Sequence, residues 1–131
     1  MNYITAHISK IQSIDTINVV SFISHDQSLK MMSLELDASL QVGTQLRLGT
    51  KSSNVSLAKA FSGELSIDNQ LPCTISGFEV GELLVVVKLN FFDTMIESII
   101  TKDSFVRMKL QKGDAVIALI KSSELSIVEV L

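Results

Sequence analysis

The chain has very little cysteine, proline and aromatic side chain, and each shortage excludes a class of protein. Of its 131 residues, one is Cys, one is Pro, none is Trp, and 5% are aromatic. The single cysteine, Cys73, excludes an intramolecular disulfide, and no Cys/His cluster has the spacing of a zinc site. Because 47% of the residues are nevertheless hydrophobic, we expect an aliphatic core of Ile, Val, Leu and Met with some Phe.

Long hydrophobic runs are also missing. The longest, LLVVV and AVIALI, are far shorter than the roughly 20 residues of a membrane-spanning helix. The first residues, MNYITAHISK, lack the basic and apolar regions of a signal peptide. The sequence therefore predicts a soluble, cytoplasmic protein without a membrane partner.

Charge and side-chain chemistry argue against two further classes. Lys and Arg number 11 against 14 Asp and Glu, whereas binding to nucleic acid requires a dense basic face. His7 and His25 stand at spacings unrelated to any serine that could act as a nucleophile. We expect a binding protein that is neither an enzyme nor a partner of nucleic acid.

Apolar residues alternate with a period of two along most of the chain, which is typical of β-strands. The alternation predicts an all-β fold with the same order of strands in both halves, at residues 4–11, 16–23, 29–36, 45–50 and 54–59, and again at 73–78, 82–90, 94–101, 114–121 and 124–130. Residues 102–110, KDSFVRMKL, break the pattern and predict one short helix, capped by Thr101 or Asp103.

Turn-forming residues gather in the middle of the chain, in AKAFSGELSIDNQLP. They predict a boundary near residues 62–68, with a first repeat at 1–65 and a second at 66–131. Five strands in roughly 65 residues fit a small closed or partly open β-barrel. Because a barrel of this size is marginally stable alone, the halves should pack together or oligomerise.

A short polar motif occurs in both halves, as Lys51-Ser52-Ser53 and as Lys121-Ser122-Ser123, with an offset of 70 residues (121 − 51 = 70). Each copy follows a predicted strand and offers a cation, hydroxyl groups and backbone N–H groups, a set that suits a tetrahedral oxyanion. The same three residues are also typical of a solvated turn.

Thr101 and Ser104 add donors at the start of the predicted helix. They could converge with Lys121 and Ser122 on one dianion. A plain helix cap is the alternative interpretation of this Thr-x-x-Ser.

The second half resembles the molybdate-binding Mop (TOBE) domain family. The matching elements are Ile100-Thr101 with Ser104, the segment Leu110-Gln111-Lys112-Gly113-Asp114, and the strand end Ala118-Leu119-Ile120-Lys121-Ser122-Ser123. The linker LSIDNQLP also resembles a Ser-Ala-Arg-Asn-x-Leu element of the family. The first half is a degenerate copy, so the chain is similar to tandem Mop proteins, the molbindins.

This resemblance implies two OB-like five-stranded barrels that assemble into a homo-oligomer, with molybdate or tungstate bound between barrels and no organic cofactor. It implies an oxyanion site made of Thr101, Ser104, Lys121, Ser122, Ser66, Lys51 and Ser52. Storage, buffering and delivery of the anion are all compatible with it. Asp68 stands where the family commonly has Arg, and a carboxylate there repels a dianion. The alternative is therefore an oligomerisation module of the same fold that has lost anion binding.

Other residues that suggest chemistry have simpler interpretations. Met31 and Met32 are adjacent in a strand, point to opposite faces and cannot both ligate one metal ion. Cys73 is expected to be buried, His7 to face solvent, and His25 to lie in a hairpin loop.

Overall fold

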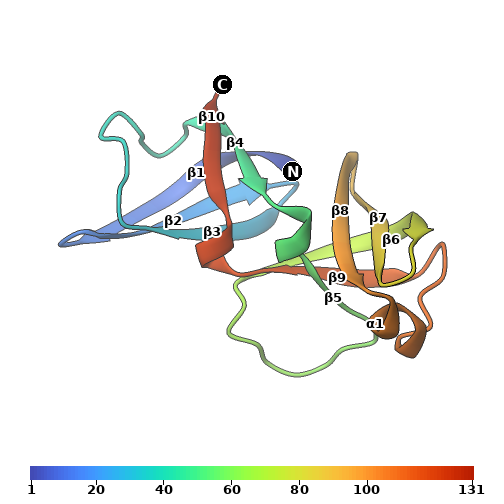
Figure 1. Ribbon diagram of the computed structural model, residues 1–131. Helices are drawn as coiled ribbons and strands as arrows, with labels where there is room; N and C mark the ends of the chain where they lie inside the picture. Colours follow the sequence, from blue (N-terminus) through green and yellow to red (C-terminus); the bar gives the residue numbers. More distant parts are fainter.

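A computed structural model describes residues 1–131 and shows an all-β molecule with a single short α-helix in its second half (Figure 1). The strands of the first half are β1 (Asn2–Ile14), β2 (Ile17–Ser24), β3 (Gln27–Ser33), β4 (Gln45–Thr50) and β5 (Ser56–Ala58). Those of the second half are β6 (Asn69–Val80), β7 (Leu84–Phe91), β8 (Thr94–Thr101), β9 (Ala115–Ile120) and β10 (Ser126–Val130). The remaining elements are the helix α1 (Lys102–Arg107) and two 3-10 turns, η1 (Ser52–Asn54) and η2 (Ser122–Glu124). The predicted fold class is confirmed.

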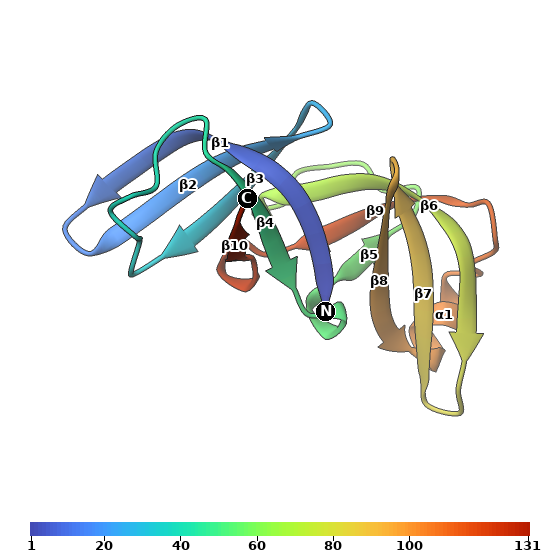
Figure 2. The same cartoon turned by 90° about the horizontal axis from the view of Figure 1, so that it is seen from above.

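The ten strands form two five-stranded antiparallel sheets, and each sheet takes its last strand from the other half. One sheet has the order β10-β4-β1-β2-β3, and the other has the order β5-β9-β6-β7-β8. Figures 1 and 2 show β10 beside β4 and β5 beside β9. The sequence predicted the strands and the repeat, but not this exchange. The division at residues 65 and 66 stays a prediction about the repeats.

Alternation of apolar side chains places one face of each sheet in a common core. Every second residue is buried from Asn2 to Ile8 in β1 and from Asn69 to Ile75 in β6. The resulting cluster of 23 buried residues includes Phe22 and Phe91 and draws on both sheets. It is largely aliphatic, as the composition predicted.

The two adjacent methionines, the cysteine and the two histidines lie where the sequence predicts them. Met31 is 4% exposed and Met32 is 50% exposed, so they face opposite sides of β3. Cys73 is buried, and this burial raises the pKa of its thiol to about 11. His7 is exposed. His25 lies in the β2–β3 turn, where its ring stacks on Phe92 with the ring centroids 4.8 Å apart.

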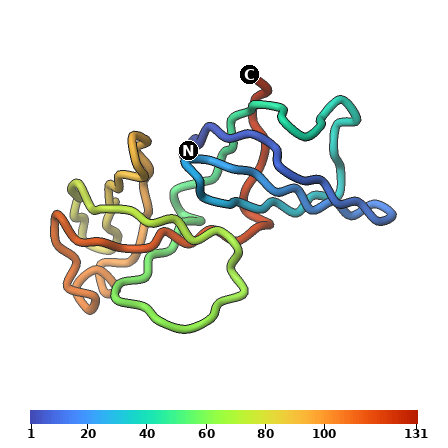
Figure 3. The backbone as a smooth tube through the Cα atoms, turned by 180° about the vertical axis from the view of Figure 1, so that it is seen from behind, coloured from blue at the N-terminus to red at the C-terminus, as the bar shows by residue number.

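The turn-forming segment AKAFSGELSIDNQLP predicts Pro72 to lie in the linker, but the structure places this residue inside β6, opposite Ile117 of β9. A proline in a central strand normally removes a ladder hydrogen bond. Here β7 pairs with β6 only from Thr74 onward, so beside Pro72 one flank of β6 has no partner strand. The missing N–H group therefore does not break the sheet. The linker that remains, residues 59–68, forms the wide loop in Figure 3.

Two buried asparagines connect the halves. The side chain of Asn69, which is fully buried, accepts a hydrogen bond from Lys30 N (2.7 Å) and donates one to Lys30 O (2.9 Å) in β3. Asn2 makes the same pair of bonds to Glu97 of β8, both at 2.8 Å. Each half is thus bound by its first strand to the third strand of the other half.

Candidate functional site

The two Lys-Ser-Ser motifs lie where the chain crosses from one sheet to the other. Lys51 follows β4 and precedes η1, which leads to β5 in the opposite sheet, and Lys121 does the same between β9 and η2. Both lysines have extended backbone, and each carbonyl accepts a 2.9 Å hydrogen bond from the residue three positions later. The repeated motif therefore has a shared structural task, which is to turn the chain at the crossing.

The polar groups of the motif remain available after this task is met. Lys51 and Lys121 are exposed, and neither takes part in any of the four ion pairs of the chain. Ser52 is 9% exposed and Ser122 is 6% exposed, yet their hydroxyl groups make no hydrogen bond within the chain. Neither hydroxyl is itself fully buried, so each stays open to a ligand or to water. Each crossing thus carries an unpaired cation beside an unpaired donor.

The carboxylate of Glu124 lies between the two crossings, near these donors. Glu124 Oε2 accepts a hydrogen bond from Asn54 Nδ2 at 2.8 Å, which joins η1 to η2. Both residues line a cleft of about 210 Å³ together with Lys51, Ser123 and Ser126. The carboxylate opposes binding of a dianion in this small cleft.

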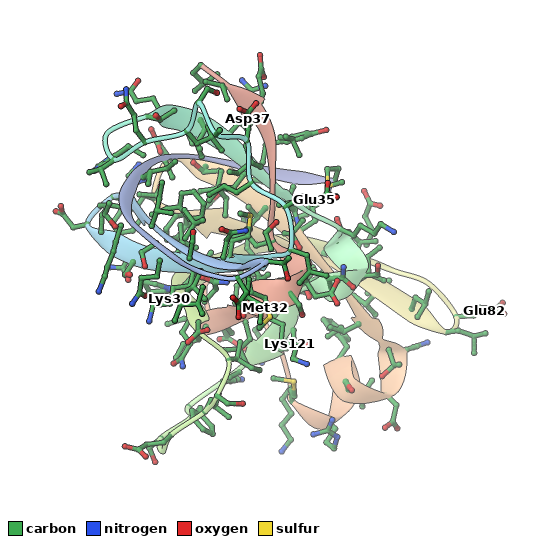
Figure 4. All side chains as sticks on the ribbon, turned by 90° about the vertical axis from the view of Figure 1, so that its left-hand side faces the viewer. Lys30, Met32, Glu35, Asp37, Glu82 and Lys121 are labelled. Carbon is green, nitrogen blue, oxygen red and sulfur yellow. The ribbon has the colours of Figure 1, made fainter.

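The strand exchange changes which predicted residues lie together. In the structure, η1 packs against β8, and η2 packs against β3. Lys121 immediately precedes η2, and in the view of Figure 4 it projects beside Met32 of β3. We expected Lys121 and Ser122 beside Thr101 and Ser104. Within one chain, the turn packed against β8, the strand that ends at Thr101, is instead that of Lys51 and Ser52.

Thr101 and Ser104 form the predicted cap of α1. Thr101 Oγ1 accepts a hydrogen bond from Ser104 N (3.1 Å) and donates one to Ser104 Oγ (3.0 Å). Ser104 Oγ also accepts a hydrogen bond from Arg107 Nη2 (3.1 Å). Arg107 is not among the site residues predicted from the sequence. Its position three residues after Ser104 in a helix was the available signal, because such residues share a face.

Ser104 and Arg107 line a second cleft of about 470 Å³, between β5 on one side and β8 with α1 on the other. We call it the α1 cleft. Its other polar residues are Ser53, Ser56 and Lys59. Lys59 Nζ donates to the carbonyls of Met108 (3.2 Å) and Lys109 (3.0 Å) and pairs with Asp114 at 3.0 Å. Lys59 thereby fixes the end of α1, while Arg107 is in none of the ion pairs.

Ser66 and Asp68 lie in the linker just before Asn69. Both are exposed, and no ion pair neutralises Asp68 within the chain. Because Asn69 binds β3, this end of the linker reaches the strand that also contacts η2. Ser66 does not line the α1 cleft.

No three His, Cys, Asp or Glu side chains gather as metal ligands in the chain. None of its helices has the length and apolarity required to span a bilayer.

Comparison with known proteins gives three findings. Residues 65–127 match the model of the TOBE domain. The molybdenum import ATP-binding proteins ModC of Brucella abortus and Brucella suis are 31% identical over 108 residues, which cover 76% of this chain but only 30% of ModC. A crystal structure of the cytoplasmic molybdate-binding protein ModG, with molybdate bound, superposes with a TM-score of 0.90 at 26% identity. It covers 96% of this chain and 94% of the other. The expectation of a binding protein and not an enzyme agrees with this likeness.

Proposed function

We propose that this chain, which is a TOBE-domain protein, is a cytoplasmic molybdate-binding protein. One observation carries the proposal: almost the whole chain, 96% of it, superposes on a molybdate-binding protein with a TM-score of 0.90. A likeness confined to residues 65–127 would support only one domain of that kind. The superposition includes the degenerate first half as well.

The predicted residues supply donors at two places. Lys51 and Ser52 belong with Thr101 and Ser104 at the end that contains α1. Lys121 and Ser122 belong with Ser66 at the end that contains β3. The first place combines residues from both halves, and the second brings residues of the second half to β3 of the first half, because the strands are exchanged. A tetrahedral dianion needs many donors, and each set has one lysine with several hydroxyl and N–H groups.

A neighbouring copy of the chain completes these sites in our proposal. The donors lie at the surface, and a homo-oligomer would enclose the anion between barrels. Tungstate, which has the same charge and shape, is expected to bind as well. The role that fits such a protein is storage, buffering or delivery of the anion.

Isothermal titration calorimetry with molybdate, tungstate and sulfate tests the proposal. We expect heat with the first two and none with sulfate, and weaker binding in Lys51→Ala and Lys121→Ala. Lys10→Ala, an exposed lysine in β1, is the matched control and should bind as the wild type does.

A second candidate function is an oligomerisation module that has lost anion binding. The carboxylates of Asp68 and Glu124, one in the linker and one between the crossings, favour it. Absence of heat with all three anions, from a protein that still oligomerises, would establish this second function.

A further inference from the structure

The molecule has two clefts that are equivalent by the repeat and opposite in charge, and each is lined by residues of both halves. The α1 cleft is lined by two cations and no carboxylate. Its counterpart, a cleft of about 520 Å³ between β10 and β3 with the loop after it, is lined by three carboxylates and no cation. We call the counterpart the acidic cleft.

The opposite charges come from residues at equivalent positions. Arg107 of the α1 cleft corresponds to Asp37 of the acidic cleft, and Lys59 corresponds to Glu129, each with the 70-residue offset of the Lys-Ser-Ser motif. The serines do not change: Ser53 and Ser56 correspond to Ser123 and Ser126 in the same way. The halves therefore keep the hydroxyl donors and differ in the charge beside them.

Asp37 is firmly ionised. Hydrogen bonds from the backbone N–H and the hydroxyl of Ser39 hold the pKa of this carboxyl below its ordinary value. Glu129 is paired with Arg47 at 2.7 Å and Lys59 with Asp114 at 3.0 Å, so the unpaired charges are Glu35 and Asp37 in the acidic cleft and Arg107 in the α1 cleft. At neutral pH the two free carboxylates repel an anion from the acidic cleft, whereas Arg107 attracts one to the α1 cleft.

Hydrogen bonding prepares Ser104 to donate into the α1 cleft. Its Oγ accepts from Thr101 Oγ1 and from Arg107 Nη2, so its own hydroxyl proton is left for a ligand. Accepting two hydrogen bonds, one of them from a cation, also makes this hydroxyl a stronger donor. Arg107 has further N–H groups beyond the one used, and guanidinium groups suit oxyanions.

We propose that the α1 cleft is a binding site for one tetrahedral oxyanion, in which Arg107 supplies the charge and Ser104, Ser53 and Ser56 donate hydrogen bonds. The carboxylates of the acidic cleft oppose an anion, so this cleft is not a second site of this kind; Lys121, Ser122 and Ser66 of the proposed function lie outside its lining. This inference rests on the proposed function, because molybdate is the anion expected. It adds Arg107, which neither the motif nor the family resemblance includes.

Calorimetric titration of the full chain with molybdate, on Arg107→Gln and Arg107→Lys, is the test. Arg107→Gln should lower the affinity about tenfold to a hundredfold, since a charge-assisted hydrogen bond is lost. Arg107→Lys should restore part of it by keeping the charge. Asp37→Asn, at the equivalent position of the acidic cleft, is the control and should not weaken binding. Arg107 is exposed, and melting temperatures without molybdate should show that all three variants fold.

The outcomes separate this inference from the proposed function. If the wild type binds molybdate and Arg107→Gln binds it equally well, the α1 cleft is not the site and the proposed function stands. If the wild type binds no molybdate, both are overturned. An anomalous-difference map from crystals grown with molybdate gives a second test. Molybdenum beside Arg107 supports the inference, and molybdenum found only elsewhere overturns it.

Discussion

Thr50 occupies the position in β4 that Ile120 occupies in β9, and the difference leaves a polar atom in the core. Thr50 is 3% exposed, and its Oγ1 is the one buried side-chain oxygen or nitrogen of the chain without a hydrogen bond. An unsatisfied buried hydroxyl costs roughly 1–3 kcal/mol. The second half avoids this cost with a hydrocarbon side chain.

Thr50→Val should therefore stabilise the protein by about 1 kcal/mol, because valine keeps the shape and removes the unpaired hydroxyl. Urea denaturation followed by far-UV circular dichroism measures the change. Thr5→Val, an exposed threonine of β1, is the control and should change little. Destabilisation of Thr50→Val would mean that Oγ1 has a partner, such as a buried water.

The carboxylate of Asp114 stabilises the turn that precedes β9. Its carboxylate accepts a hydrogen bond from Gln111 N (2.9 Å) and pairs with Lys59, and these contacts lower its pKa, the backbone bond most strongly. In the first half Thr44 Oγ1 accepts the equivalent bond from Gln41 N (3.2 Å) without a charge.

The lowered pKa of Asp114 predicts a pH dependence. The folded state favours the ionised carboxylate, so its contribution to stability is present above the ordinary pKa of 3.8 and is lost as the pH falls below it. Asp114→Thr, which copies the first half, should lack this contribution. The melting-temperature difference between wild type and Asp114→Thr should shrink between pH 7 and pH 3. A difference that stays constant over this range would contradict the assignment.

At the scale of elements, the period-two alternation predicted the strands well, and the break at residues 102–110 predicted α1. The alternation says which face of a strand is buried, and little more. It therefore did not show that Pro72 can lie in β6, because that depends on where β7 stops pairing. It also did not show what Asn2 and Asn69 do. The sequence signal for these contacts was a polar residue at a position of β1 and of β6 where the alternation predicts a buried side chain.

Asn69→Ala should destabilise the protein by about 2–4 kcal/mol, since it leaves both the N–H and the carbonyl of Lys30 unpaired. Chemical denaturation measures the loss. Gln70→Ala, at the exposed neighbouring position, should cost far less. Equal effects of the two substitutions would show that the contact between β6 and β3 contributes little.

At the scale of the whole molecule, the exchange of β5 and β10 makes the halves interdependent. Each sheet is completed by a strand from the other half, and the crossings place each Lys-Ser-Ser turn against the third strand of the opposite half. A change in one half is therefore transmitted to the other through a shared sheet.

Removal of β10 tests this arrangement. A chain truncated after Leu125 should lose protection from hydrogen exchange at β4, in the first half, because β10 pairs with β4. Amides of β9, which pairs with β5 and β6, should remain protected. Loss of protection in β9 instead of β4 would show that β10 pairs within its own half.

The sequence by itself determined the fold class, the order of the strands, the helix with its Thr101 cap, and the repeated Lys-Ser-Ser at the ends of β4 and β9. Local patterns suffice for these because alternation, capping and internal repetition are properties of short segments. The tertiary structure alone decided that β5 pairs with β9 and β10 with β4. The two repeats have the same alternation, so either fourth strand offers a suitable edge to either fifth strand. This choice in turn decided that Lys51 shares an end of the molecule with Thr101. It also decided that Lys59 and Arg107 line one cleft while Asp37 and Glu129 line its counterpart, since each cleft is built from strands of both halves.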